Sequence, residues 1–306
     1  MMKKLLSLSL VAAACLVGCR TAVEPAGDPS HVKVLMIGNS FSISCLTYLP
    51  QVAADCGQKL DLGSLYIGGC SLERHMTNVA AERADPKAKG AYRYDRVTDL
   101  GPRVIVRDAR LTDVLTRVKW DVVTIQQASH LSWKGDSYHP WGDDLVKTVR
   151  TLAPQAKIVV QETWSYTPFD ARLAQWKISA DEMDARLADA YAAFAGTYGF
   201  ETIRMGRAVA AWRKRLPVAY GEHTFGGDVV GGRNQKPEDQ FKRNADLTWS
   251  VNSDAFHLNE KGEYLQALVW AAKLLDADLA GLKSHPACVT DDEARLMRQI
   301  AQELAK

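Results

Sequence analysis

Apolar runs of strand length alternate with longer segments of helical periodicity along most of the chain. Residues 32–37 form an unbroken apolar run, which is typical of a strand buried on both faces. Four more strands are predicted at residues 60–67, 121–127, 158–162 and 200–204, and helices at residues 46–56, 143–152, 180–197, 207–215, 260–275 and 291–304. This alternation predicts the α/β class, as a three-layer α/β/α sandwich with a central parallel sheet of about five strands.

Two predicted helices begin at capping signals. Asn259 is the predicted N-cap of the helix at 260–275, and Thr290 opens a capping box before the last helix.

Two stretches have no predicted helix or strand. Residues 80–103 are polar and charged, and no element is assigned to them. Residues 217–251 are rich in glycine and show little periodicity. A segment of that length without periodicity is typical of a binding loop or a mobile lid.

The first nineteen residues predict export and lipidation. Lys3 and Lys4 precede an apolar stretch over residues 5–17 that is too short to span a membrane. The stretch ends at Cys19 in a Leu-Val-Gly-Cys sequence that resembles a bacterial lipobox. We therefore expect a lipoprotein signal peptide over residues 1–18, lipidation of Cys19 and a tether over residues 19–30. The alternative is an ordinary secretory signal with a chance cysteine. Arg20, in place of an aspartate, favours the outer membrane, so the predicted location is the outer membrane, cell surface or periplasm.

Charge and cysteine content restrict the partners. Without residues 1–18 the chain has 36 basic and 36 acidic residues, so no net field attracts nucleic acid. The cysteines beyond the leader can pair in three ways in an exported protein, or they can remain free thiols. A Cys45–Cys70 bridge is conceivable, and free thiols are the alternative. These four cysteines are Cys45, Cys56, Cys70 and Cys288. No CxxC or HxxxH spacing occurs, so no metal site is predicted.

The candidate chemistry lies at the two ends of the predicted domain. A Gly-Asn-Ser turn follows the first strand and presents Ser40 at the carboxyl edge of the sheet. Asp254 and His257 lie three residues apart just before a helix. A serine hydroxyl needs a base that a third group holds in place, so Ser40 is the predicted nucleophile, His257 the base and Asp254 its partner. Ser42 and Ser71 are competing nucleophiles, and a capping aspartate beside a surface histidine is the structural alternative.

These motifs resemble those of SGNH (GDSL-like) hydrolases, in particular the bacterial secreted branch DUF4886. The resemblance covers residues 32 to about 275. Residues 38–42 resemble the nucleophile block, residues 68–73 the block with an oxyanion-hole glycine, and residues 254–258 the DxxH block. The resemblance implies a flavodoxin-like SGNH fold in a single domain over residues 31–306. It also implies ester hydrolysis through an acyl-enzyme on Ser40, without a cofactor.

The oxyanion hole departs from the family pattern. Backbone N–H groups of Ser40 and Gly69 are the first two predicted donors, with Gly68 as the runner-up to Gly69. The third block places Ala128 in the glycine position and His130 in the asparagine position. A side-chain amide, from Gln127 or from Gln126, is the predicted third donor, and His130 is its rival. The structural alternative is that both glutamines only hold neighbouring loops.

Substrate contacts are predicted from the residues after the fourth strand. Glu162, Trp164 and Tyr166 follow this strand, and aromatic rings beside a carboxylate suit stacking on a sugar ring. A Trp packed under the loop is the alternative. Gln126 and His130 complete the predicted contacts. Other candidates from loops are Trp133, Trp141, His139 and His223, none of them singled out. The sequence predicts a serine esterase that cleaves a short acyl group, such as O-acetyl, from a carbohydrate. A non-catalytic glycan-binding lipoprotein and a structural component of a surface assembly are the alternatives.

Overall fold

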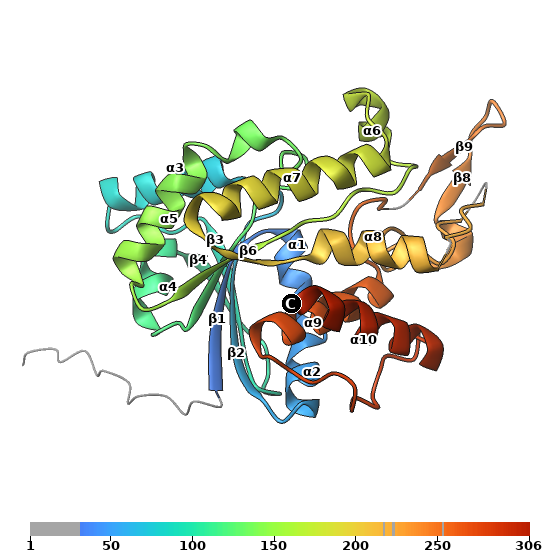
Figure 1. Ribbon diagram of the computed structural model, residues 1–306. Helices are drawn as coiled ribbons and strands as arrows, with labels where there is room; N and C mark the ends of the chain where they lie inside the picture. The colour runs from blue at the N-terminus through green and yellow to red at the C-terminus, as the bar shows by residue number, and fades with distance from the viewer. Residues whose placement is uncertain (1–30, 217, 222–223, 253) are drawn as a thin grey trace, which may run out of the picture.

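A seven-stranded sheet runs through the middle of the computed structural model, which describes residues 31–216, 218–221, 224–252 and 254–306 (Figure 1). The predictions for the leader, Cys19 and His223 lie outside these residues. The strands are β1 (His31–Gly38), β2 (Lys59–Tyr66), β3 (Tyr92–Thr98), β4 (Val104–Ala109), β5 (Val122–Ile125), β6 (Lys157–Gln161) and β7 (Glu201–Ile203), in the order β4-β3-β2-β1-β5-β6-β7. The five from β2 to β7 in this order are parallel, and each corresponds to a predicted strand.

The two outer strands β3 and β4 are antiparallel, and the sequence did not predict them. β3 is hidden in the pattern because its contacts are polar as well as apolar, whereas β4 is an edge strand whose apolar residues 104–106 are exposed. Asp95 of β3 is fully buried and pairs with Arg93 and Arg103, at 2.8 Å each. Asp61 of β2 is paired in the same way with Arg96. Each buried carboxylate is thus neutralised by a neighbouring guanidinium, which makes a strand look like a charged loop.

Helices cover both faces of the sheet, as Figure 1 shows. One layer contains α3 (Leu72–Ala84), α4 (Leu111–Arg117), α5 (Trp141–Leu152) and α7 (Ala180–Tyr198), and the other contains α1 (Ser40–Ile43), α2 (Leu49–Asp55), α8 (Met205–Arg215), α9 (Glu260–Leu274) and α10 (Asp291–Ala305). The predicted three-layer α/β/α sandwich is confirmed. Asn259 caps α9 by accepting from Gly262 N–H, and Thr290 and Glu293 form the predicted capping box of α10. Among the described residues, no helix has both the length and the apolar character needed to cross a membrane.

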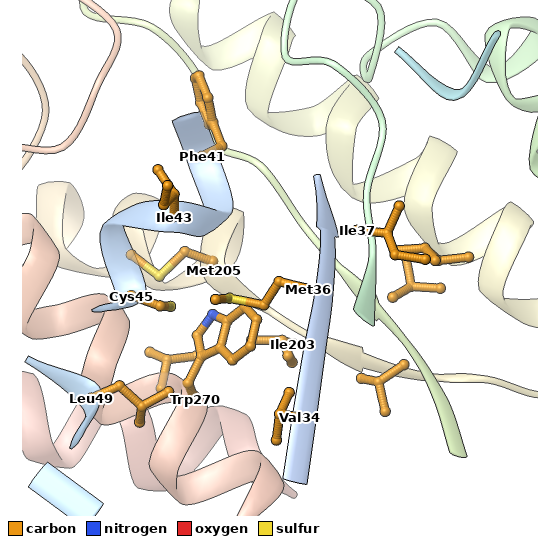
Figure 2. Close-up of a cluster of buried hydrophobic side chains, with 14 of the residues drawn as sticks. Val34, Met36, Ile37, Phe41, Ile43, Cys45, Leu49, Ile203, Met205 and Trp270 are labelled. Carbon is orange, nitrogen blue, oxygen red and sulfur yellow. The ribbon is translucent and has the colours of Figure 1, made fainter. Parts of the chain in front are cut away.

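The central strand β1 is buried on both faces, as its apolar run predicts. Val34 and Met36 point toward Trp270 of α9, and Ile37 points to the opposite side of the strand (Figure 2). These three side chains of β1 and that of Trp270 are each at most 1% exposed. The predicted helix at 46–56 begins later than expected: α2 starts at Leu49, with Pro50 in its first turn, where the missing N–H of proline costs nothing. The packing of β1 side chains on both faces of the strand holds the carboxyl end of β1, and the turn that follows it, in one position.

The predicted unstructured stretch at 217–251 contains regular structure of its own. A short hairpin of β8 (Phe241–Arg243) and β9 (Trp249–Val251) projects beyond α8, in orange in Figure 1. Its base is anchored by aromatic contacts: Phe241 lies 5.1 Å from Phe169 and 5.0 Å from Phe225, measured between ring centroids. The hairpin lies on the same side of the molecule as α6 (Ala171–Trp176).

Candidate active site

Ser40 is the first residue of α1, and only Asn39 separates it from the end of β1. Asn39 caps the helix by accepting the N–H of Phe41 at 3.0 Å. Gly38 is required at the bend, since a Cβ there would lie 2.5 Å from Ser42 Oγ. The turn therefore presents the Ser40 hydroxyl at the carboxyl edge of the central strand, where ligands bind in open α/β sheets.

Ser40, His257 and Asp254 are joined by hydrogen bonds. The distance from Ser40 Oγ to His257 Nε2 is 2.7 Å, and His257 Nδ1 bonds Asp254 Oδ2. Asp254 Oδ1 accepts the N–H groups of Phe256 and His257, both at 2.9 Å. Burial pushes the pKa of Asp254 upward, but the hydrogen bonds from His257 and the backbone leave it below its usual value. The structure thus brings the three residues together in the order that activation of a serine requires.

The competing serines are engaged elsewhere. Ser42 is buried and its hydroxyl donates to the backbone carbonyl of Asn39 at 3.1 Å. Ser71 is the N-cap of α3 and accepts the N–H of Arg74 at 3.2 Å. Both hydroxyls are engaged with the backbone, whereas that of Ser40 meets an imidazole, so Ser40 is the candidate nucleophile that the geometry favours.

A buried segment, residues 228–232, braces the DxxH turn, and the sequence analysis missed it. Gly231 N–H donates to the carbonyl of His257 and Gly232 N–H to that of Asp254, both at 2.8 Å. The two glycines have φ of +92° and +69°, a backbone conformation that residues with a side chain rarely adopt. A Cβ on Gly231 would also lie 2.8 Å from the ring of Phe225. The Gly-Gly pair was the available signal, because consecutive glycines often mark such a backbone.

The brace is itself tied to α8 by a buried ion pair. Arg213 binds Asp228 through Nε and Nη2, with a shortest distance of 2.9 Å, and Asp228 is fully buried. Tyr220 donates its hydroxyl to the same carboxylate at 2.7 Å. Asn259, the cap of α9, donates its amide to the carbonyl of Asp228 at 2.8 Å. These contacts link α8, the brace and the start of α9 behind the acid–base pair.

Trp164 does not line an open site, so its predicted role in substrate binding is wrong. The side chain is fully buried, and its indole N–H donates to the carbonyl of Phe256 at 2.9 Å. Its ring stacks on Phe41 with centroids 4.3 Å apart. The alternative, a Trp packed under the loop, is correct.

Glu162 is also wrong as a substrate contact. It is 2% exposed and points toward the start of α8, where its carboxylate accepts the N–H of Arg207 at 3.3 Å. Gly206 permits this approach, since a Cβ there would lie 2.5 Å from the carbonyl oxygen of Thr163. Burial raises the pKa of Glu162 to about 7, against the lowering effect of Arg207. Glu162 does follow a strand end, as predicted, but its side chain lies between α7 and α8. There its carboxylate accepts a backbone N–H group at the start of α8.

Of the predicted oxyanion donors, Gly69 lies in a turn beside the nucleophile, whereas the amide of Gln127 is bonded elsewhere. Gly69 lies in an exposed turn with φ of +60°, and Asn39 Nδ2 ties that turn to the nucleophile turn through the carbonyl of Cys70 at 3.0 Å. Gln127 is wrong as a donor, because its amide N–H₂ bonds Ser137 at 2.7 Å while its oxygen accepts from Leu72 and Ala128. It holds loops together.

Gln126 and His130 complete the predicted contacts. Gln126 is buried and donates to Asn39 Oδ1 at 2.7 Å, so it supports the nucleophile turn and does not face substrate. His130 is exposed, and desolvation of its ring, with the charges of Lys134 and Arg172, lowers its pKa. His130 therefore keeps its place as a candidate contact.

The described cysteines are free thiols. Cys45 and Cys70 are buried, and the predicted alternative of a bridge between them is wrong. Burial raises the pKa of Cys70 to about 12, so the thiol form dominates. Cys56 and Cys288 are half-buried and also unbridged. Within the part of the chain that the structure describes, no three His, Cys, Asp or Glu residues form a group that suits a metal ion.

Residues 33–182 match the model of DUF4886, a domain of unknown function. The match includes Ser40 and Gly69 and ends before Asp254. A DUF4886 protein of known structure from Bacteroides uniformis is 25% identical, with a TM-score of 0.73 over 89% of this chain and 94% of that one.

Solved structures with lower similarity include proteins named as an esterase and as a lipolytic protein. A family 3 carbohydrate esterase from Clostridium thermocellum is 16% identical, with a TM-score of 0.42 over 80% of this chain and 96% of that one. A lipolytic G-D-S-L family protein from Veillonella parvula is 12% identical, with a TM-score of 0.41 over 80% and 98%. No curated protein matches the sequence. The predicted resemblance to DUF4886 is therefore confirmed, by the family match over residues 33–182 and by the fold that most of the chain shares with the Bacteroides uniformis protein.

Proposed function

We propose that the protein is a serine esterase that acts through an acyl-enzyme on Ser40. The observation that carries this is the 2.7 Å contact between Ser40 Oγ and His257 Nε2, with Asp254 on the far side of the imidazole. His257 takes the serine proton as Oγ attacks the ester carbonyl, and it then gives that proton to the departing alcohol. Water repeats the sequence on the acyl-enzyme and releases the acid. Asp254 fixes the imidazole tautomer and stabilises its charged form.

The developing oxyanion is assigned to two backbone donors. The N–H of Ser40 and the N–H of Gly69 lie on turns that Asn39 joins through its hydrogen bonds. One such donor contributes about 3 kcal/mol to the transition state. Neither Gln126 nor Gln127 adds a side-chain donor to these two N–H groups, because both amides donate to other residues in the described structure. This lowers the expected rate but leaves the mechanism intact.

The proposed substrate is a short-chain ester, with O-acetyl on a carbohydrate as the first candidate. Export and lipidation at Cys19 would bring the enzyme to such esters outside the cytoplasm. The test is hydrolysis of 4-nitrophenyl acetate by the wild-type protein, Ser40→Ala and His257→Ala. We expect each substitution to reduce kcat by several orders of magnitude with the fold intact by circular dichroism. Equal rates for all three proteins would overturn the esterase and favour a non-catalytic, glycan-binding role.

A further inference from the structure

A cleft of about 680 Å³ opens beside the Asp254 end of the candidate triad. One wall is the start of α6, with Asp170 and Arg172. The opposite wall is the β8–β9 hairpin, with Trp249 and Ser250, and the floor includes Phe256. Asp254 itself lines the cleft, so the cleft adjoins the acid–base pair directly.

The hairpin directs Trp249 toward this cleft. Trp249 and Val251 share one face of β9, because side chains alternate along a strand. Val251 pairs with Phe241 across the hairpin, and Phe241 packs on the buried aromatic group with Phe169 and Phe225. Trp249 lies on the same face of β9 as Val251, farther from this aromatic group, and is 43% exposed. A large aromatic side chain is thus held at the cleft rim by an anchored base.

The other wall supplies polar groups in a fixed geometry. Asp170 receives both arms of the Arg172 guanidinium, at 2.8 Å and 2.6 Å. The guanidinium lies 4.0 Å above the ring of Phe256 and 4.4 Å above that of Tyr166. It is held by the carboxylate and the two rings, yet its side chain is one-third exposed. Arg172 keeps hydrogen-bonding capacity for a ligand, since a guanidinium has five N–H groups and Asp170 accepts only two of them. Asp170 is 7% exposed and also accepts the backbone N–H of Arg172, so its role is to hold the guanidinium in place.

The proposed mechanism indicates which part of the ester reaches the cleft. His257 must protonate the departing alcohol, so the alcohol lies on the His257 side of Ser40. The carbonyl oxygen lies on the other side, toward the N–H of Gly69. Asp254 is the neighbour of His257 on the side remote from Ser40. An alcohol larger than one ring therefore extends past His257 toward the cleft.

We propose that the cleft binds the alcohol portion of the substrate, and that this portion is a saccharide. The apolar face of a sugar ring stacks on Trp249, and its hydroxyl groups bond the guanidinium of Arg172. A lipid chain is the poorer fit, because it would desolvate the Arg172–Asp170 pair without replacing its hydrogen bonds with water. This proposal rests on the esterase function above, and it moves the aromatic platform from Trp164 to Trp249.

The experiment compares two substrates and two variants from the same hairpin. 4-Nitrophenyl acetate is too small to occupy the cleft, whereas acetylated xylo-oligosaccharides extend into it. For Trp249→Ala we expect a 3- to 10-fold fall in kcat/KM on the oligosaccharides, mainly through KM, and less than a 2-fold change on the small ester. Trp249→Phe should recover most of the loss. Leu247→Ala is the matched control, since Leu247 is exposed on the same hairpin and does not line the cleft.

Two results would overturn the saccharide site. One is an unchanged kcat/KM for Trp249→Ala on both substrates, and the other is an equal loss on both. Failure of the esterase itself is recognised separately, by binding. Ser40→Ala is titrated calorimetrically with the acetylated oligosaccharides, alone and combined with Trp249→Ala. Binding that weakens only with the Trp249 change supports the cleft even without turnover, and absence of binding contradicts it.

Discussion

The indole N–H of Trp164 donates a 2.9 Å hydrogen bond to the carbonyl oxygen of Phe256, the residue before His257. The same ring stacks on Phe41, the residue after Ser40, with centroids 4.3 Å apart. One buried side chain therefore contacts the neighbours of both the candidate nucleophile and the candidate base. The distance between Ser40 Oγ and His257 Nε2 depends on both segments staying in place, and Trp164 is a positioning residue for that pair.

Trp164→Phe should lower kcat on 4-nitrophenyl acetate several-fold with little change in KM. The phenyl ring keeps a stack on Phe41 but leaves the buried Phe256 carbonyl without its donor, at a cost of about 1–3 kcal/mol in stability. Trp120→Phe is the matched control: Trp120 is equally buried and donates to the carbonyl of Val114 at 3.0 Å, remote in sequence from both segments. Equal kinetic losses in the two variants would show that Trp164 acts only through stability.

Asp254→Asn should reduce kcat by about 10⁴ with the thermal midpoint nearly unchanged. The amide oxygen can keep the hydrogen bonds from the N–H groups of Phe256 and His257, so the turn survives. The amide N–H₂ would face His257 Nδ1 and favour the wrong imidazole tautomer. Steady-state kinetics with differential scanning calorimetry check both parts. A variant with the wild-type rate would remove Asp254 from the triad.

Arg213→Met should lower the free energy of unfolding by about 3–5 kcal/mol, because it leaves the Asp228 carboxylate buried without its charge partner. Urea unfolding followed by circular dichroism measures the loss. The double variant Arg213→Met with Asp228→Leu should recover much of it, since the uncompensated charge is gone. Asp292→Asn is the control, because it breaks an exposed pair with Arg295 and should change stability by less than about 0.5 kcal/mol. A loss of that small size for Arg213→Met would contradict the brace.

Glu162 predicts a pH dependence of stability with an unusual sign for a carboxyl group. Its pKa rises from 4.5 to about 7 on folding, so between these values the native state holds a proton that the unfolded state has released. Stability therefore falls as pH rises through this window, by about 3 kcal/mol in total, and is unaffected by this group above it. Glu162→Gln does not titrate. The thermal midpoint of the wild type should fall relative to the variant from pH 4.5 to 7, and parallel curves would contradict the shift.

The sequence predicted the parallel part of the sheet and the grouping of Ser40, His257 and Asp254 for the same reason. Strands such as β1 are buried on both faces, so their apolar runs are unbroken, and Ser40 follows where such a run stops. Asp254 and His257 carry a spacing that one turn can place together. These signals are local, and they needed only the α/β topology to bring the two chain ends to one edge.

The remaining errors concern side chains whose direction is set by distant partners. Glu162 and Gln127 follow strand ends as expected, yet Arg207 and Ser137 draw them away from Ser40. The polar pattern of β3 conceals a buried Asp95 whose partners include Arg103, outside the strand. Such pairings link residues far apart in sequence or in different elements, and no periodicity within one segment reveals them.

The candidate triad is divided between the turn after β1 and the turn before α9, and this division affects the order of folding. Ser40 and all seven strands of the sheet lie in the part of the chain up to Ile203 of β7. The acid and base follow some fifty residues later, and their turn is held by a brace that closes on the same stretch. A partly folded chain can therefore carry an assembled sheet with a serine that lacks its base, and the proposed hydrolysis requires that the turn and α9 have docked.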